Sequence, residues 1–375
     1  MVKNIFKHYI YPIATLSGSI IGVGFLALPY ITLQVGVLPM LAYFFILTLF
    51  VVCIHIMFGR ISLATPDFKR WPGFVGYYFG PWAKRFIMVP MIVGLVGILL
   101  IYLIVGSQFL SALLSPFIGG TGLFYALTYF VAASSLIFFG IKAVSRFEFW
   151  ALLIFLFSLG MLFFKGVSFI HMENFSFAPF AFHLDNFFLP YAAIVFSLWG
   201  TGLIPEVEEM LRGNKRSFNT VIILGTLIPA ALYFLFVVLV LGISGGQTTE
   251  SALIGLKQFL GNSIVSVALL VGIITTFNAF ISQGLLLKKV FIYDMGANEF
   301  SGWVLACLPP LILFLLGAHS FIPLLSFIGG ALLSIDGILI LLMYRKIGGS
   351  KFLVYPLMVF FVLAVAYQLY SLYHL

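Results

Sequence analysis

The sequence has very few charged residues and almost no cysteine. Charged side chains make up 8% of the 375 residues, whereas 63% are hydrophobic and 18% aromatic. A soluble domain of this length needs a far richer charged surface, so cytosolic enzymes and free nucleic-acid-binding proteins are excluded. Cys53 and Cys307 lie in apolar runs without metal-ligand spacing, which excludes a disulfide framework and a zinc site. The composition indicates an integral membrane protein.

Long apolar runs fill the chain. A hydrocarbon core of about 30 Å requires roughly 20 apolar helical residues. We expect an all-α polytopic membrane protein with eleven transmembrane helices, over residues 9–33, 37–59, 86–113, 123–141, 148–164, 187–211, 218–242, 263–287, 300–317, 321–343 and 352–373. The first run is too long for a signal peptide and has no small-residue cleavage site.

The basic residues predict an orientation. With the N-terminus in the cytoplasm, 17 of the 19 Lys and Arg fall in inner loops, and only Lys165 and Lys257 lie outside. Cytoplasmic loops of membrane proteins carry such an excess. The net charge of +8 is therefore a topology signal, and its spread over short loops does not suit nucleic acid. We expect a cell-membrane protein with a cytoplasmic N-terminus and, after an odd number of spans, a C-terminus outside.

An internal repeat relates the two halves of the chain. Gly22 and Gly24 recur 178 residues later as Gly200 and Gly202, and the following helices correspond within a few residues. Five crossings are an odd number, so the second half enters from the opposite face as an inverted repeat. We expect one transmembrane domain over 1–375, with repeat 1 over 9–164, repeat 2 over 187–343 and an extra helix over 352–373.

Helices 1 and 6 carry signals for a break in the membrane. Glycines and a proline occur together over residues 17–29 and again over 197–205, so each helix should unwind near the midplane. Free N–H groups suit a carboxylate, and free carbonyls suit an ammonium or a small cation, which together describe an amino acid. The alternative is close helix packing through Gly18 and Gly22, but the matched pair at the repeat offset favours two breaks.

These motifs resemble a known family. The residues Gly18-Ser19-Ile20-Ile21-Gly22-Val23-Gly24, Ala27-Leu28-Pro29-Tyr30, Gly200-Thr201-Gly202 and Pro205-Glu206-Val207-Glu208-Glu209-Met210 are similar to those of the amino acid/auxin permeases and their bacterial relatives, the hydroxy and aromatic amino acid permeases. The resemblance covers nearly the whole chain. It implies the five-plus-five inverted fold of the amino acid, polyamine and organocation superfamily and alternating-access transport of an amino acid.

The resemblance also implies substrate-binding residues. Backbone N–H groups of Gly22, Val23 and Gly24 would bind the carboxylate, and helix 1 and helix 6 carbonyls, including that of Gly200, would bind the ammonium. Ser19, Phe196, Ser197 and Trp199 would line the amino-group side. The candidates for the side-chain pocket are Trp199, Tyr102 and Phe280, although in a chain with 44 Phe plain packing is the alternative.

The coupling ion stays open between sodium and protons. No phosphate-binding GxxxxGK[ST] loop occurs in the sequence, so transport should be secondary. Similarity to sodium-coupled members of the superfamily points to carbonyls of Gly18 and Ile21 with hydroxyls of Thr275 and Thr276. The alternative for these threonines is a hydrogen bond to a carbonyl of their own helix.

Acidic residues within the spans are the proton candidates, because a charge there is costly and usually functional. Asp336 lies nine residues before Arg345, about 13 Å from the inner end of its helix; an ion pair or polar contact is the alternative. Glu206 could act as an inner gate or a proton acceptor. Helix 5 has only Lys165, at its outer edge, so the lysine that replaces sodium in some relatives has no counterpart, which favours sodium.

We therefore expect a secondary transporter and not an enzyme. Its substrate would be a neutral amino acid, with aromatic or hydroxylated side chains as options, carried with Na⁺ or H⁺ and no further cofactor. Its partners would be substrate and bilayer, without nucleic acid, and the chain could act as a monomer. The rivals are an amino-acid sensor, a channel and a membrane enzyme built on His183 and Asp185. We expect His55 and His319 at the membrane interfaces.

Overall fold

The chain folds into helices. The computed structural model describes residues 6–67, 69–139, 144–175, 188–211 and 215–373, and no residue in these ranges lies in a strand. The α-helices are α2 (Tyr11–Ile20), α3 (Leu28–Val35), α4 (Val37–Ala64), α5 (Trp71–Phe79), α6 (Pro81–Ile118), α7 (Gly122–Phe139), α8 (Val144–Gly166), α10 (Leu189–Leu198), α11 (Ile204–Met210), α12 (Lys215–Ser244), α13 (Lys257–Leu260), α14 (Asn262–Lys289), α15 (Glu299–Leu315), α16 (Phe321–Phe327), α17 (Leu333–Lys346) and α18 (Lys351–Tyr373). The 3-10 helices η2 (Gly24–Ala27) and η5 (Thr201–Leu203) and the π-helix η8 (Ile328–Leu332) interrupt three apolar segments.

Each predicted span contains helical residues, which confirms the all-α class. Seven described helices are long and apolar enough to cross a membrane, and α2 with α3 forms an eighth candidate, bent by 52°. The apolar stretches Leu153–Phe169 and Glu299–Leu315 are shorter, and helix 6 is divided between α10 and α11. The lengths agree with an integral membrane protein, while the count of eleven spans and the inverted repeat stay predictions.

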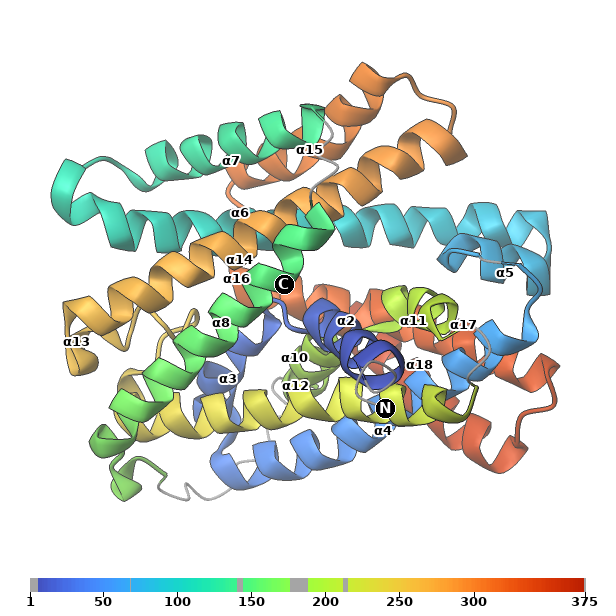
Figure 1. Cartoon of the computed structure of the whole chain (residues 1–375), viewed down its shortest axis with the longest axis horizontal. Helices are drawn as coiled ribbons and strands as arrows, with labels where there is room; N and C mark the ends of the chain where they lie inside the picture. The colour runs from blue at the N-terminus through green and yellow to red at the C-terminus, as the bar shows by residue number, and fades with distance from the viewer. Residues whose placement is uncertain (1–5, 68, 140–143, 176–187, 212–214, 374–375) are drawn as a thin grey trace.

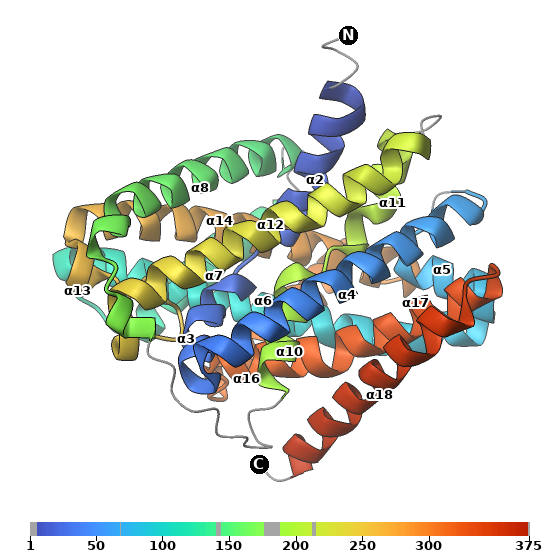
Figure 2. The same cartoon turned by 90° about the horizontal axis from the view of Figure 1, so that it is seen from below.

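Two helices that the sequence predicts to be broken lie in the middle of the molecule. Figure 1 and Figure 2 show α2 and α10 between one side formed by α4 and α12 and another formed by α6 and α14. Helix α12 packs against α2 and α4, α14 against α6 and α8, and α10 against α4 and η8. The approach of α10 to η8 requires Gly329, because a Cβ there would lie 2.1 Å from the Ala192 carbonyl oxygen.

A proline in α12 leaves a carbonyl oxygen free for a hydrogen bond between this helix and α2. Proline has no N–H, so the carbonyl four residues earlier lacks its helical donor. Pro229 of α12 therefore leaves the oxygen of Gly225 available. Ser17 Oγ of α2 donates to that oxygen at 3.1 Å. The hydrogen bond ties α2 to α12 one turn before α2 ends.

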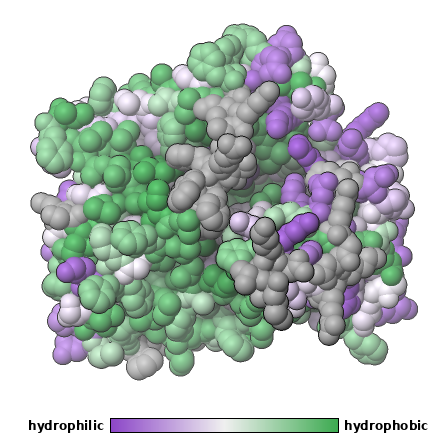
Figure 3. Space-filling model, in the orientation of Figure 1, coloured by the Kyte–Doolittle hydropathy of each residue, from purple (hydrophilic) through white to green (hydrophobic). Residues whose placement is uncertain are grey.

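Charged residues gather toward the ends of the bundle. Figure 3 shows a hydrophobic middle on the visible face, with most hydrophilic residues toward the end where α5 lies. Helix α6 has 38 residues and is about 57 Å long. Lys84 Nζ near its start lies 3.4 Å from Asp294 Oδ1. Near its end, Lys257 Nζ donates to the Ala112 oxygen at 3.2 Å, an acceptor that Pro116 leaves without a helical donor. Lys84, predicted inside, and Lys257, predicted outside, thus lie at opposite ends of α6. Which end faces the cytoplasm stays a prediction.

Candidate functional site

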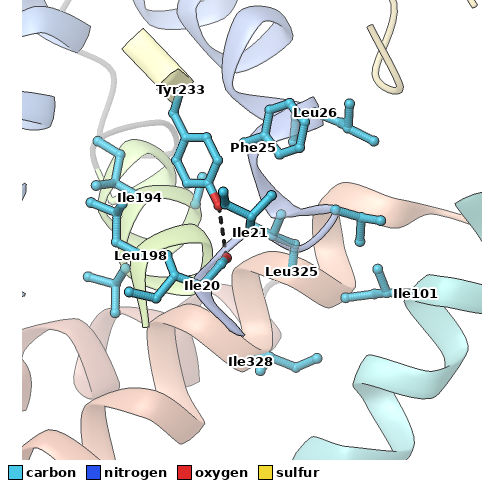
Figure 4. Close-up of a cluster of buried hydrophobic side chains, with 14 of the residues drawn as sticks. Ile20, Ile21, Phe25, Leu26, Ile101, Ile194, Leu198, Tyr233, Leu325 and Ile328 are labelled. Atoms are coloured by element: carbon cyan, nitrogen blue, oxygen red, sulfur yellow. Dashed lines mark hydrogen bonds between the residues drawn. The ribbon is translucent and has the colours of Figure 1, made fainter. Parts of the chain in front are cut away.

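The first break (residues 21–23) ends α2 at the predicted glycine motif. Ile21 leaves the helical conformation with a ψ of 88°. The Ile20 carbonyl oxygen accepts one hydrogen bond from Gly22 N–H at 2.8 Å and another from the Tyr233 hydroxyl of α12, also at 2.8 Å. Figure 4 shows the tyrosine reaching the end of α2. The discontinuity predicted for helix 1 is confirmed, and a side chain of α12 holds its terminal carbonyl.

The second break (residues 199–200) ends α10 before η5 and α11. Trp199 is extended, with a φ of −72° and a ψ of 114°. Gly200 N–H donates to Nε2 of His55, from α4, at 3.1 Å. Leu203 N–H closes a turn onto the Gly200 oxygen at 3.3 Å. The discontinuity predicted for helix 6 is also confirmed, and here a side chain holds an N–H group instead of a carbonyl.

The two segments touch at their breaks, and glycine makes the contact possible. A Cβ on Gly24 would lie 2.6 Å from Phe196 Cδ1 and 2.7 Å from Ser197 Oγ. A Cβ on Gly200 would lie 2.5 Å from Ile20 Cγ1. Such distances are too short for carbon contacts in a close-packed interior. Neither glycine can therefore be enlarged without displacing side chains of the opposite helix.

A cavity lies against the first break, between α6, α8, α12 and α14. We call it the break cavity. Its lining combines backbone at the break, three hydroxyl side chains and an apolar wall, and consists of Gly22, Val23, Phe25, Leu26, Phe109, Phe155, Ser158, Leu159, Leu162, Phe236, Leu253, Ala268, Val271, Gly272, Thr275 and Thr276. None of these lining residues carries a charge. The arrangement can accept a small molecule with a polar end and an apolar end.

Several predicted substrate residues gather at this cavity. Gly22 and Val23 line it. Tyr102 of α6 lies at its edge, because its hydroxyl oxygen is 3.2 Å from where a Cβ on Gly22 would be. Ser197 does not line the cavity but faces Gly24, and its buried hydroxyl has no hydrogen-bond partner within the described chain. Unpaired buried hydroxyls are rare in proteins, so Ser197 can serve a ligand.

Other predicted substrate residues lie elsewhere. Trp199 packs edge-on against His55, with the ring centres 6.2 Å apart. Phe280 is fully buried, and its ring centre lies 6.0 Å from that of Tyr129. Ser19 is exposed and donates to a carbonyl of its own helix at 2.8 Å. Their roles in binding stay predictions, and the aromatic residues that line the cavity are different ones.

The predicted cation ligands divide between two places. Thr275 and Thr276 line the break cavity, whereas Gly18 and Ile21 do not. Both threonine hydroxyls donate to carbonyls one turn earlier in α14, that of Thr276 at 2.8 Å. The hydroxyl protons are therefore used within the helix, as in the alternative interpretation. The oxygen lone pairs remain able to accept or coordinate, so this geometry leaves cation binding open.

The two predicted acids do not line the break cavity. Asp336 of α17 lies beside the indole of Trp71. Glu206 of α11 lies near the charge of Arg70, and its Oε2 is buried without a hydrogen-bond partner among the described residues. Because Arg70 and Trp71 are neighbours in sequence, both acids approach the turn that begins α5. We call these two residues the acid pair.

The sequence interpretation missed two side chains that hold the breaks. His55, expected at a membrane interface, is fully buried, and that expectation is wrong. Tyr233 was assigned no role. Each is a polar side chain within a long apolar span, which is the signal that points to function in a membrane. His319 is exposed in the turn between α15 and α16, as expected. His183 and Asp185, on which the enzyme alternative depends, lie outside the described residues.

Comparison with known proteins identifies the family. The family described as transmembrane amino acid transporter protein matches residues 9–334, and the chain belongs to it. The match confirms the resemblance that the helix 1 and helix 6 motifs indicate. The chain is thus an integral membrane protein of an amino acid transporter family.

Solved structures show a similar fold. The crystal structure of MhsT in complex with L-phenylalanine has a TM-score of 0.57 and 12% sequence identity, over 96% of this chain and 97% of that chain. At this identity the likeness concerns the fold alone. No curated protein matches the chain significantly.

Proposed function

We propose that the chain is a secondary active transporter that carries a neutral amino acid with an aromatic or other apolar side chain, together with Na⁺ or H⁺, by alternating access. The observation that carries this proposal is the break cavity. It joins an interrupted helix, hydroxyl groups and an apolar wall in one space. Small-molecule sites in proteins have the same mixed lining, mostly apolar with a few polar groups.

The polar end of the cavity suits the amino acid backbone. Gly22 and Val23 bring main chain to its surface. The Gly22 N–H already donates to the Ile20 oxygen, so the N–H groups that follow it at the broken helix are the ones offered to a carboxylate. We propose that the unpaired hydroxyl of Ser197, which faces Gly24 beside the cavity lining, supplies a further polar contact. These groups recognise what all amino acids share.

The apolar end favours the class of side chain. Phe109, Phe155 and Phe236 line it, and aromatic rings pack favourably against other rings. A lysine, arginine or acidic side chain would lie here without an opposite charge among the lining residues, at a large desolvation cost. We therefore propose a neutral, apolar substrate. L-phenylalanine, the ligand in the crystal structure of MhsT, is a suitable first probe.

The coupling ion is proposed from the same cavity. Thr275 and Thr276 bring hydroxyl oxygens to it, whereas Asp336 and Glu206 do not line it. Carbonyl and hydroxyl oxygens near an unwound helix commonly bind sodium in secondary transporters. This distribution supports sodium over protons.

The test is uptake of labelled L-phenylalanine by liposomes that contain the purified full chain. One set has an inward sodium gradient and a second has an inward proton gradient. We expect accumulation under sodium, with competition from other apolar amino acids and not from lysine or glutamate. Accumulation under protons alone would move the coupling to the acid pair. Absence of uptake of any amino acid by folded protein would overturn the proposal.

A further inference from the structure

We infer that His55 is a positioning residue for the transport site, acting as a neutral hydrogen-bond acceptor that fixes the second break. His55 comes from α4 and is fully buried. Its Nε2 accepts the Gly200 N–H at 3.1 Å, and its Nδ1 lies 2.9 Å from Thr226 Oγ1 of α12. One imidazole ring thus joins α4, the second break and α12.

The hydrogen bonds define the tautomer of His55 from both sides. A backbone N–H can only donate, so Nε2 facing Gly200 must carry no proton. Independently, the Thr226 hydroxyl donates its single proton to the Ile222 oxygen at 2.9 Å. Thr226 can therefore only accept from His55, and Nδ1 must carry the proton. Both arguments give the neutral ring with hydrogen on Nδ1.

Gly200 needs this partner because of where it lies. The N–H groups that begin a helical segment have no acceptor within it, and a buried N–H left unpaired is costly. Gly200 is buried and belongs to the short segment between α10 and α11. His55 supplies an acceptor that no residue of that segment supplies in the described structure.

Through Gly200, His55 also fixes the position of the first break. Gly200 packs against Ile20 so closely that a Cβ would lie 2.5 Å from Ile20 Cγ1. Ile20 is the last residue of α2, and its carbonyl is held by Tyr233 of α12. Thr226 and Tyr233 are seven residues apart, two turns along the same face of α12. Helix α12 therefore braces both breaks, directly through Tyr233 and indirectly through His55.

Two substitutions separate the two hydrogen bonds of the ring. The amide of glutamine reaches the position of Nε2, so His55→Gln keeps an acceptor for Gly200. The amide of asparagine reaches only the position of Nδ1, so His55→Asn keeps the bond to Thr226 and leaves Gly200 unpaired. We expect His55→Asn to raise the half-saturating L-phenylalanine concentration about tenfold, the effect of one buried unpaired N–H. His55→Gln should stay within about threefold, and maximal uptake should change less than half-saturation in both.

A third substitution removes the other partner of the ring. Thr226→Val takes away the acceptor of the Nδ1 proton. The proton stays on Nδ1, because a proton on Nε2 would face the Gly200 N–H and break that hydrogen bond. Gly200 keeps its acceptor, so we expect half-saturation in Thr226→Val to stay within about threefold, as in His55→Gln. Equal losses in His55→Gln and His55→Asn, or normal uptake in His55→Asn, would overturn the inference.

A spectroscopic measurement on the unsubstituted chain covers the case in which a variant does not fold. Nitrogen-15 labelling of the six histidines distinguishes ring nitrogens with and without a proton, and the folded His55→Gln or Thr226→Val protein identifies the His55 signals. We expect a proton on Nδ1 and none on Nε2. A proton on Nε2, or a doubly protonated ring, would overturn the inference. The uptake tests rest on the proposed transport function, whereas this measurement does not, so the two can fail separately.

Discussion

The two helix breaks use similar glycine motifs in different ways. The first break lies on the wall of the break cavity through Gly22 and Val23, and its carbonyl is held by the hydroxyl of Tyr233. The second break lines no part of that cavity, and its N–H is held by His55. One break brings main chain to the cavity, while the other is enclosed by side chains.

This difference shows that two segments related by a sequence repeat can have different roles. Both breaks need small residues because the two helices approach each other. Each, however, faces different neighbours, since α4 supplies the partner at one and α12 at the other. We propose that the binding surface belongs to the first break and that the second acts as its support.

The largest effect should come from filling the first break. In Gly24→Leu the new side chain would collide with Phe196 and Ser197, whose atoms lie within 2.7 Å of the position of Cβ. We expect L-phenylalanine binding and uptake to fall about a hundredfold or more, as expected when main-chain ligands move by about 1 Å. Gly160→Ala is the control, because a Cβ there meets nothing within 4 Å. Unchanged binding in Gly24→Leu would show that the first break is not the binding surface.

The next effect concerns the ion. Replacing Thr275 or Thr276 by valine removes an oxygen from the cavity but little volume. We expect the half-saturating sodium concentration to rise about tenfold, because one contact to a charged group contributes about 1.5 kcal/mol or more. Thr128→Val is the matched control, since Thr128 makes the same bond to its own helix at 2.8 Å but lies exposed on α7. An unshifted sodium dependence would remove the threonines as ligands.

A smaller effect should distinguish a residue that supports the first break from a residue that binds substrate. Tyr233→Phe removes the donor to the Ile20 carbonyl, which keeps its bond from Gly22 N–H. We expect substrate affinity to fall about three- to tenfold and stability to fall by about 1 kcal/mol. Tyr191→Phe loses a bond of 2.7 Å to Ser334 away from the breaks, so its stability should fall similarly with affinity unchanged. Equal affinity losses in the two variants would contradict the bracing role.

The smallest effect should come from the acid pair. Asp336→Asn and Glu206→Gln alter residues outside the break cavity. We expect sodium-driven uptake to stay within about twofold, since these side chains contact neither the first break nor the lining hydroxyls. Uptake that loses its response to a proton gradient in either variant would instead assign the coupling to that acid.

The sequence predicts helices and breaks well, because both depend on residues that are close together along the chain. Apolar length defines the spans, and glycine with proline marks the segments 17–29 and 197–205, within which residues 21–23 and 199–200 are unwound. The side chains that complete the site depend on distant contacts. His55 and Tyr233 lie 145 and 213 residues from the backbone atoms that they hold, and no pattern along the chain joins them.

The side-chain pocket was harder to predict for a related reason. Helices such as α4, α6 and α14 are apolar around their whole circumference, so periodicity does not show which side faces the interior. The prediction named Trp199, Tyr102 and Phe280, whereas the cavity is lined by other aromatic residues, among them Phe109 and Phe155. The rotation of each helix follows from packing with its neighbours.

Thiol labelling within the break cavity tests the central claim that substrate occupies this space. Cys53 is exposed and is replaced by serine, while Cys307 is buried. Leu159→Cys, at a partly exposed position of the lining, then reports on the cavity, and Ser168→Cys, in the exposed 3-10 helix Val167–Phe169, is the control. The account predicts that bound L-phenylalanine slows labelling at position 159 and not at position 168. Binding measured in the same variant without any protection at position 159 would contradict it.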